Sequence, residues 1–315
     1  MPRTSLENSP ATADLTVLPV PGEGAEDVVV DHQGSVYTGT EDGSVFRLRN
    51  EGNRIERIGT THGRPLGLEL LPDGRILVCD AKRGLLAMNP ADGRCELLTD
   101  SVDGQRLLFC NNAAVASTGE IFFSDSSRIH PIERWKDEMV HDTRSGRLLR
   151  RNTDGSVDVL LEELAFANGV ALAADESFVA VAESGARTVV RRWLTGPREG
   201  SSDHLAPDLP GYPDNIARGS DGLIWVTISS PMDPVVERLM RAPKFLKRAA
   251  LKLPEVLQPK PKRTVRVMAF DSSAGVVRDC SLDAASFHMA TGVREHEGRV
   301  WLGSLVEPAV AYFEL

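Results

Sequence analysis

Polar side chains suited to metal binding recur just before strand-like hydrophobic runs in this sequence. They occur in GEGAEDVVV, FCNNAAV, FANGVAL and YPDNIAR, and in chain order they are Glu26, Asn111, Asn112, Asn168, Asp214 and Asn215. Carboxylate and carboxamide oxygens suit a hard divalent cation, above all Ca²⁺, with Mg²⁺ and Mn²⁺ as alternatives. Zinc fits less well because the set lacks His and Cys. Each residue alone could instead form a turn, so the metal hypothesis requires that they converge.

A recurring unit supplies the elements that could bring these residues together. A short polar turn followed by an alternating strand appears six times, in DHQGSVYTG, LPDGRILVCD, STGEIFFSD, AADESFVAVAE, SDGLIWVTIS and EHEGRVWLGS. The alternation has the period of a strand, and units of roughly 40 to 50 residues match four-stranded propeller blades. A β-sandwich or two β domains would not account for six similar units. The sequence therefore predicts an all-β fold, a six-bladed β-propeller.

The propeller prediction also sets the domain organisation and the place of the polar residues. Residues 1–20 are expected to form an N-terminal tail, and 21–315 a single propeller domain with a helical insertion at 231–263. The C-terminal EHEGRVWLGSLVEPAVAYFEL is expected to complete a blade with an N-terminal strand, which removes exposed sheet edges. Because the inner strands of all blades meet at a central channel, the polar residues before them are expected to converge there.

Composition limits the classes of function. The chain has 315 residues, 41% of them hydrophobic, and its formal net charge of −9 argues against a nucleic-acid binder. Its four cysteines form no C-x-x-C pair, so buried free thiols and a reducing compartment are expected. No apolar run is long enough for a signal peptide or a membrane span. These features predict a cytoplasmic protein.

The segment 231–263 differs from the rest of the chain in charge. It carries nine Lys or Arg residues against three Asp or Glu. Its apolar residues recur at three- or four-residue spacing, which predicts short amphipathic helices interrupted at Pro243 and ended near Pro254. One interpretation is a lid whose apolar stripe packs on the channel mouth. The other is a patch that contacts anionic membrane and brings the mouth to apolar substrates.

An ordered set of motifs resembles a known family. GRPLGLELLPDGRILVCD, FCNNAAV, FSDSS, FANGVALAADESF, LPGYPDNIARGSDGLIWV and EHEGRVWLGS resemble the strictosidine-synthase-like propellers, and among them the adipocyte plasma membrane-associated protein branch. That group is related to the gluconolactonase, senescence marker protein and luciferin-regenerating enzyme group and to the paraoxonases. The resemblance implies a divalent metal in the channel and hydrolysis of lactones or other esters. It implies ligands at Glu26, Asn111, Asn168 and Asp214, with Asn215 as an additional ligand.

The resemblance also bears on the reaction. Strictosidine synthase uses a catalytic glutamate four positions before the Glu of a Glu-His-x-Gly stretch, and this chain has Thr291 there, which argues against condensing activity. The expected function is metal-dependent hydrolysis of a small lactone or ester, with Asp214 as the acid/base. His62 and His130 are alternative proton acceptors because imidazole is well matched to neutral pH. The alternative function is a non-catalytic propeller that binds a small ligand or a protein and keeps a structural metal.

Overall fold

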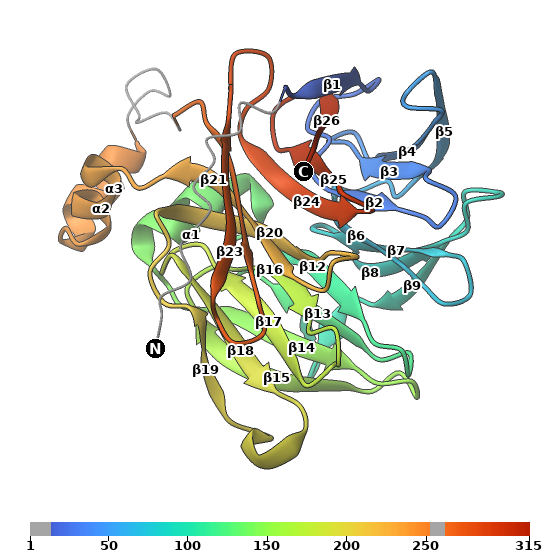
Figure 1. The fold of residues 1–315 in the computed structure, drawn as a ribbon. Coiled ribbons are helices and arrows are strands. Elements are labelled where there is room, and N and C mark those ends of the chain that lie inside the picture. Colours follow the sequence, from blue (N-terminus) through green and yellow to red (C-terminus); the bar gives the residue numbers. More distant parts are fainter. Residues whose placement is uncertain (1–13, 253–261) are drawn as a thin grey trace, which may run out of the picture.

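Six four-stranded antiparallel sheets form the blades of a β-propeller (Figure 1). The structure is a computed structural model and describes residues 14–252 and 262–315. Blades one to five each consist of four strands consecutive in the chain, apart from helical insertions. The six-bladed propeller predicted from the repeated turn-and-strand units is therefore confirmed.

The first three blades run in chain order, each from the channel outward. Blade one has β2 (Val28–Val30), β3 (Val36–Gly39), β4 (Ser44–Arg49) and β5 (Arg54–Thr60). Blade two has β6 (Pro65–Leu70), β7 (Ile76–Asp80), β8 (Gly84–Met88) and β9 (Cys95–Thr99). Blade three has β12 (Cys110–Val115), β13 (Ile121–Asp125), β14 (Gly146–Arg151) and β15 (Val157–Leu164).

The second half of the propeller follows the same pattern. Blade four has β16 (Ala167–Leu172), β17 (Phe178–Glu183), β18 (Thr188–Trp193) and β19 (Ser202–Ala206). Blade five has β20 (Gly211–Arg218), β21 (Ile224–Pro231), β22 (Val265–Phe270) and β23 (Val276–Leu282). Blade six has β24 (Ala290–His296), β25 (Arg299–Ser304), β26 (Ala309–Glu314) and β1 (Thr16–Pro19). A small hairpin of β10 (Ser101–Val102) and β11 (Gln105–Arg106) precedes blade three.

The N-terminal strand closes the ring. β1 pairs antiparallel with β26, from Thr16 opposite Tyr312 to Pro19 opposite Ala309. This is the closure expected from the C-terminal sequence. It also places a strand inside the segment 1–20, which was expected to be a tail, so the propeller begins at β1 rather than at residue 21. Joining both ends of the chain in one sheet ties the last blade to the first part of the chain.

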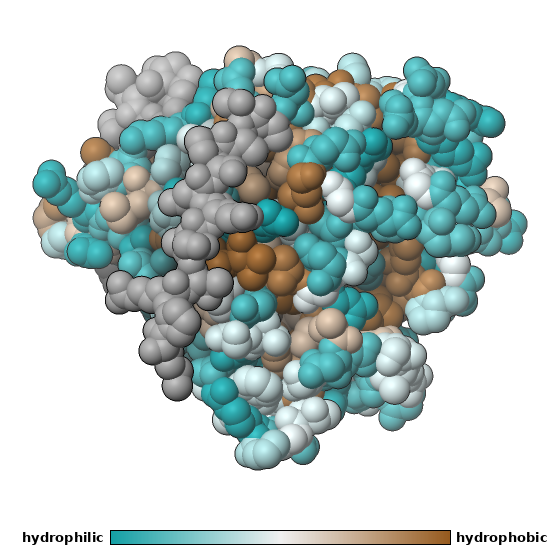
Figure 2. All heavy atoms as spheres, viewed as in Figure 1, coloured by the Kyte–Doolittle hydropathy of each residue, from teal (hydrophilic) through white to brown (hydrophobic). Residues whose placement is uncertain are grey.

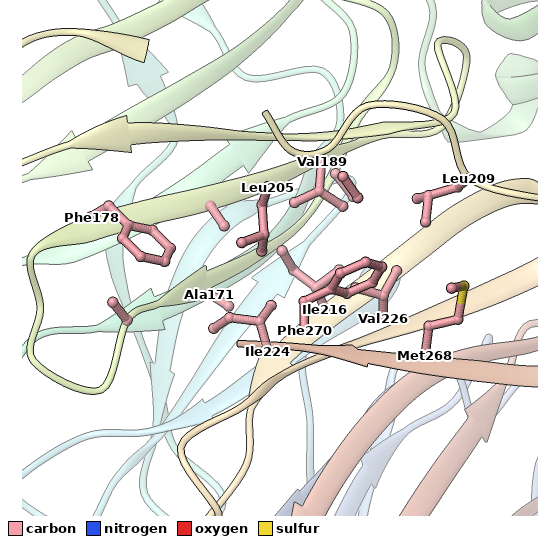
Figure 3. Close-up of a cluster of buried hydrophobic side chains, with 14 of the residues drawn as sticks. Ala171, Phe178, Val189, Leu205, Leu209, Ile216, Ile224, Val226, Met268 and Phe270 are labelled. Carbon is pink, nitrogen blue, oxygen red and sulfur yellow. The ribbon is translucent and has the colours of Figure 1, made fainter. Parts of the chain in front are cut away.

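Hydrophobic side chains fill the spaces between neighbouring blades. Figure 3 shows one such cluster, in which Phe178 and Val189 of blade four pack against Ile216, Val226 and Phe270 of blade five. All five side chains are buried. Both faces of each sheet are therefore covered, and this explains why the middle strands read as nearly continuous apolar runs.

Within the described residues, three short α-helices lie at one side of the propeller. They are α1 (Trp135–His141), preceded by the 3₁₀ turn η1 (Ile132–Arg134), and α2 (Pro234–Met240) and α3 (Lys244–Leu251) within the predicted insertion. A second 3₁₀ turn is η2 (Gly196–Arg198). Asp233 caps α2, because its carboxylate accepts hydrogen bonds from the backbone of Val235 and Val236. Residues 253–261 of the insertion lie outside the described residues.

Two sequence-level expectations can be compared directly with the fold. The four cysteines are free thiols; Cys79 and Cys110 are buried, whereas Cys95 and Cys280 are partly exposed. In the described parts of the chain, no helix has the length and apolar character needed to cross a bilayer.

Candidate metal centre and substrate cavity

The inner strands share an irregularity where they meet the channel. The register of β12 against β13 shifts across Asn111 and Asn112, and that of β16 against β17 shifts across Asn168 and Gly169. The same shift occurs between β20 and β21, and there it spans Asp214. A β-bulge re-aims a side chain that would otherwise point into the sheet's packing surface. The predicted residues of blades three, four and five therefore occupy bulges, whereas Glu26 lies in the segment before β2.

The channel is so narrow at these bulges that backbones approach one another closely. A Cβ atom added to Gly169 would lie 2.1 Å from the backbone nitrogen of Ile216 in the next blade. A side chain does not fit at this position, and the glycine lets the strands that carry Asn168 and Asp214 come together. The FANG stretch thus places the polar side chain of Asn168 next to Gly169, which allows strand β20 of the next blade to approach.

Four predicted residues border one cavity of about 210 Å³. Glu26 comes from the segment before β2, and Asn111, Asn168 and Asp214 come from the inner strands of blades three, four and five. All four are polar residues that border the same cavity despite wide separation along the chain. Their convergence on a single ion and their role as ligands stay predictions.

The carboxamide groups present oxygen atoms without partners. Asn111 Nδ2 donates to Ser126 Oγ at 2.9 Å, and Asn168 Nδ2 donates to Ser184 Oγ at 3.1 Å. The Oδ1 atoms of both asparagines are buried and accept no hydrogen bond. A buried acceptor without a partner costs free energy, so two of them in residues that border one cavity need an explanation. A bound cation would satisfy both.

Glu26 is buried, and Asp214 is half-buried. Burial raises the pKa of Asp214 to about 6, although Asn168 and Ser229 act to lower it. Burial also raises the pKa of Glu26 well above its usual value, and the negative charges of Asp27 and Asp214 raise it further. Bringing two carboxylates into one buried site is unfavourable unless positive charge is supplied.

The donor set fits a hard divalent cation. It contains two carboxylates and two free carboxamide oxygens, which are the ligand types that Ca²⁺ prefers. In residues 14–252 and 262–315, no cluster of three or more His, Cys, Asp or Glu side chains is arranged to hold a metal. The site at the channel is of a different kind, because half of its donors are Asn. It has no nitrogen or sulfur ligand that would favour zinc.

Asn215 forms hydrogen bonds with the carboxylate of Glu26. Its Nδ2 donates to both carboxylate oxygens of Glu26, at 3.2 and 3.3 Å, and its own Oδ1 is buried without a partner. Asn215 does not border the cavity. The contact orients the Glu26 carboxylate, and the predicted role of Asn215 as an additional ligand stays a prediction.

The structure does not bring the two candidate histidines to the cavity. His62 lies in the loop before β6, is exposed, and has a left-handed backbone with φ of 58°. His130 is buried, but its ring lies beside that of His141, with 6.1 Å between the ring centroids, and it does not border the cavity. Burial lowers the pKa of His130. Neither histidine borders the cavity, and their role as alternative proton acceptors stays a prediction.

The position that carries the acid in strictosidine synthase has a structural role in this chain. Thr291 is buried, and its Oγ1 donates to the backbone carbonyl of Glu26 at 2.7 Å. Its own carbonyl accepts a hydrogen bond from Thr227. Thr291 therefore fixes the backbone that carries Glu26. Glu295 is also engaged, since it accepts hydrogen bonds from Ser220 and from the backbone of Asp221 and Gly298.

Apolar residues form most of the remaining cavity wall, and the sequence patterns did not reveal all of it. They are Leu66, Phe109, Ile132, Trp135, Met139, Val140, Phe166, Val236, Leu239, Ala250, Leu251, Met289 and Leu305. Helix α1 supplies Trp135, Met139 and Val140, and it contacts both α2 and α3. The spacing of Ile132, Trp135 and Met139 is helical, and this signal could have predicted α1.

The predicted apolar stripe of the insertion divides between two environments. Val236, Leu239 and Ala250 border the cavity, as a lid requires. Leu246 is instead 46% exposed, and Leu253 lies outside the described residues. Helices α1, α2 and α3 thus cover the cavity together, while part of the apolar surface of the insertion faces solvent.

Comparisons with known proteins agree with this architecture. A family described as strictosidine synthase matches residues 111–197, and one described as strictosidine synthase-like, N-terminal, matches 11–48. The adipocyte plasma membrane-associated protein of Rattus norvegicus is 32% identical over 303 residues, covering 89% of this chain and 80% of that protein.

Two solved structures show the same fold at low sequence identity. A gluconolactonase from Xanthomonas campestris has a TM-score of 0.69 and 17% identity, covering 97% of this chain and 91% of its own. Regucalcin from Agrobacterium tumefaciens, described as a calcium-binding protein, has a TM-score of 0.63 and 12% identity, with 95% of each chain covered. These likenesses extend the fold assignment beyond the strictosidine synthase-like sequences.

Proposed function

The chain belongs to the strictosidine synthase-like family that includes the adipocyte plasma membrane-associated proteins, and from this premise we propose that it is a metal-dependent hydrolase of small apolar esters or lactones. One observation carries the proposal: two asparagines with buried oxygen atoms that lack partners, together with two carboxylates, border a cavity lined mostly by apolar residues. The fold neighbours described as a gluconolactonase and a calcium-binding protein support a hydrolase with a divalent cation.

Glu26, Asn111, Asn168 and Asp214 would hold the cation. Ca²⁺ suits this set best, with Mg²⁺, Mn²⁺ and Zn²⁺ as alternatives. When bound, a divalent cation polarises an ester carbonyl and stabilises the oxyanion that develops when water attacks. The apolar wall excludes competing water and holds the organic part of the substrate.

Asp214 would take the proton of the attacking water. In the metal-free protein, burial raises its pKa to about 6, close to the range that suits a general base. A bound cation would lower that pKa, so Asp214 would accept the proton once substrate binding loosens its contact with the ion. The candidate histidines do not border the cavity. A carboxylate is therefore the proton acceptor in this proposal.

Besides the four candidate ligands, the polar side chains that border the cavity are Lys136, Ser184, Tyr212, Ser229, Ser230 and Asp233, and each already has an interaction partner. Tyr212 donates to Glu237, Asp233 caps α2, Ser229 donates to the Tyr212 carbonyl, and Ser230 donates to the Pro231 carbonyl. A sugar lactone in this cavity would bury hydroxyl groups without partners, at roughly 1 to 3 kcal/mol each. The cavity is also smaller than the roughly 300 to 1,000 Å³ typical for drug-sized ligands. We therefore propose compact apolar substrates.

A substrate panel with controlled metal content tests the function. Metal-free protein is prepared with a chelator, and phenyl acetate, γ-nonalactone and glucono-δ-lactone are assayed after adding Ca²⁺, Mg²⁺, Mn²⁺ or Zn²⁺ singly. Turnover of an apolar substrate should return with the metal. The kcat/KM for glucono-δ-lactone should be at least about 100-fold lower, as expected if two hydroxyls stay unpaired.

The same panel separates the hydrolase from the alternative function. In a ligand-binding propeller with a structural metal, adding the cation back would raise the thermal midpoint without producing turnover of any ester or lactone. Equal activity with and without chelator would contradict metal dependence. The condensing reaction of strictosidine synthase is disfavoured because Thr291 is not a carboxylate and its hydroxyl is engaged.

A second proposal concerns the outer surface of the lid. Exposed apolar side chains gather on α2 and α3 and beside them: Met232, Val235, Phe245 and Leu246, with Phe245 69% exposed. The basic residues Arg238, Arg241, Arg248 and Lys252 are exposed on the same helices. In Figure 2, brown and tan atoms lie among teal ones at the left edge, where Figure 1 places α2 and α3. We propose that this surface contacts anionic membrane, a proposal that the membrane association in the name of the rat relative supports.

Vesicle flotation tests the membrane proposal. The protein should float with phosphatidylserine-containing vesicles at low salt, and binding should weaken at 0.5 M salt because the Debye length falls below about 10 Å. Phe245→Asp should reduce flotation strongly. Val277→Asp is the matched control, because Val277 is a comparably accessible valine on β23, 45% exposed. Absence of flotation at low salt, or an equal loss of flotation in both variants, would contradict membrane contact. The insertion would then be interpreted only as a lid over the cavity.

A further inference from the structure

Two serines connect the ligand-bearing strands of neighbouring blades. Ser126 follows β13, and its Oγ lies 2.9 Å from Asn111 Nδ2 and 2.6 Å from the carbonyl oxygen of Ala167. Ser184 follows β17, and its Oγ lies 3.1 Å from Asn168 Nδ2 and 2.6 Å from the carbonyl oxygen of Pro213. The same arrangement therefore occurs twice, one blade apart. Both serines are buried.

The serine proton determines which way each carboxamide faces. A carbonyl oxygen can only accept, so the single hydroxyl proton of Ser126 must point to Ala167. The hydroxyl oxygen can then only accept from its other neighbour, and the Asn111 atom facing it must be the NH₂ group. The carboxamide oxygen is left on the opposite side, without a hydrogen-bond partner. The same reasoning applies to Ser184 and Asn168.

We propose that Ser126 and Ser184 are positioning residues that turn the Asn111 and Asn168 carboxamide oxygens toward the cation site and thereby set its affinity. The inference rests on the metal centre proposed above. Each serine also holds the backbone just before the next ligand, because Ala167 precedes Asn168 and Pro213 precedes Asp214. One hydroxyl thus acts on two consecutive ligands.

Calorimetric titration of metal-free protein with Ca²⁺ tests the inference without reference to activity. Ser126→Ala and Ser184→Ala should each weaken Ca²⁺ affinity by roughly 10- to 100-fold, the range typical for groups that orient metal ligands. Ser44→Ala is the matched control, because Ser44 is a buried serine of blade one whose hydroxyl bonds Asp42 rather than a ligand. It should leave the affinity unchanged. Affinities equal to wild type in both channel variants would overturn the inference.

A double-mutant cycle separates orientation of the amide from support of the backbone. In an Asn111→Asp background the side chain presents an oxygen to the cation whichever way it turns, so Ser126 no longer selects between oxygen and nitrogen. The loss caused by Ser126→Ala should therefore be several-fold smaller in that background than in wild type. An equal loss in both backgrounds would show that the serine acts only through the backbone and would overturn the orientation step.

Two further measurements keep the outcomes distinct. The same double-mutant cycle can be measured for Ser184 and Asn168 in blade four. The thermal midpoint of each variant in chelator shows whether it is folded. If a variant of one pair does not fold, the other pair tests the inference. Wild-type protein that binds no divalent cation would overturn the proposed function together with this inference. Wild-type binding that both serine variants retain in full would overturn the inference alone.

Discussion

Replacing Asp214 by alanine is expected to lower kcat/KM for an apolar ester by at least about 10³-fold. The substitution removes a carboxylate ligand and, at the same time, the proposed acceptor of the water's proton, which alone is worth roughly 10² to 10⁴. Steady-state assays with saturating Ca²⁺ measure the loss. His62→Ala, assayed in parallel, should stay near wild type because His62 is exposed and does not border the cavity.

The conservative substitution Asp214→Asn separates the proposed role of Asp214 in metal binding from its proposed role in proton transfer. Asparagine keeps an oxygen that can bind a cation but cannot accept a proton at neutral pH. This variant should therefore bind Ca²⁺, with reduced affinity, and still show nearly the full loss of turnover. Near-normal activity in Asp214→Asn would assign proton transfer to another group, and normal activity in Asp214→Ala would contradict the proposed mechanism as a whole.

Metal-free protein is expected to lose stability as the pH rises from about 4 to about 7. Burial raises the folded-state pKa of Asp214 from 3.8 to about 6 and that of Asp27 from 3.8 to about 7. Glu26 is shifted in the same direction. A group with a raised folded pKa contributes stability while protonated, below its unfolded pKa, and this contribution is lost as the pH passes through the folded pKa. For Asp214 the contribution is about 3 kcal/mol when complete, and about half of it persists at pH 5.

Urea unfolding in chelator at several pH values between 5 and 8, with wild type and Asp214→Asn, measures this effect. The variant should lose less stability over the range because one of the shifted carboxyls is gone. Adding Ca²⁺ to wild type should reverse the trend, since cation binding requires ionised carboxylates and becomes stronger as the pH rises. Identical pH dependence in the two proteins would show that Asp214 is not shifted as described.

The propeller could be predicted from sequence because its determinants are local. Each blade contains a polar turn between its first and second strands, followed by an alternating strand, and these features depend on residues close together in the chain. Ring closure by the N-terminal strand followed from an incomplete last blade. The position of that strand, Thr16–Pro19, could not be predicted, because a strand of four residues is too short to distinguish from an unstructured tail by its sequence pattern.

Helix α1 and the histidines show where local patterns were insufficient. The apolar residues that follow His130 have helical spacing over only two turns. A pattern this short does not predict a helix by itself, and in the structure α1 packs against α2 and α3. Sequence places His62 and His130 at the rim because adjacent segments reach it. The direction of a loop side chain depends on the backbone conformation, which residue type does not predict. At His62 the backbone is left-handed.

The sequence by itself determined the six-bladed fold and the chemical types of the candidate donors, two carboxylates and several carboxamides at the inner strands. The tertiary structure decided which carboxamide atoms have hydrogen-bond partners, since Ser126 and Ser184, which follow neighbouring strands, accept from the NH₂ groups of Asn111 and Asn168. It also decided the raised pKa of Asp214, which arises from burial. Burial and hydrogen-bond direction are properties of the surroundings in space, so residue order specifies them only through the completed fold.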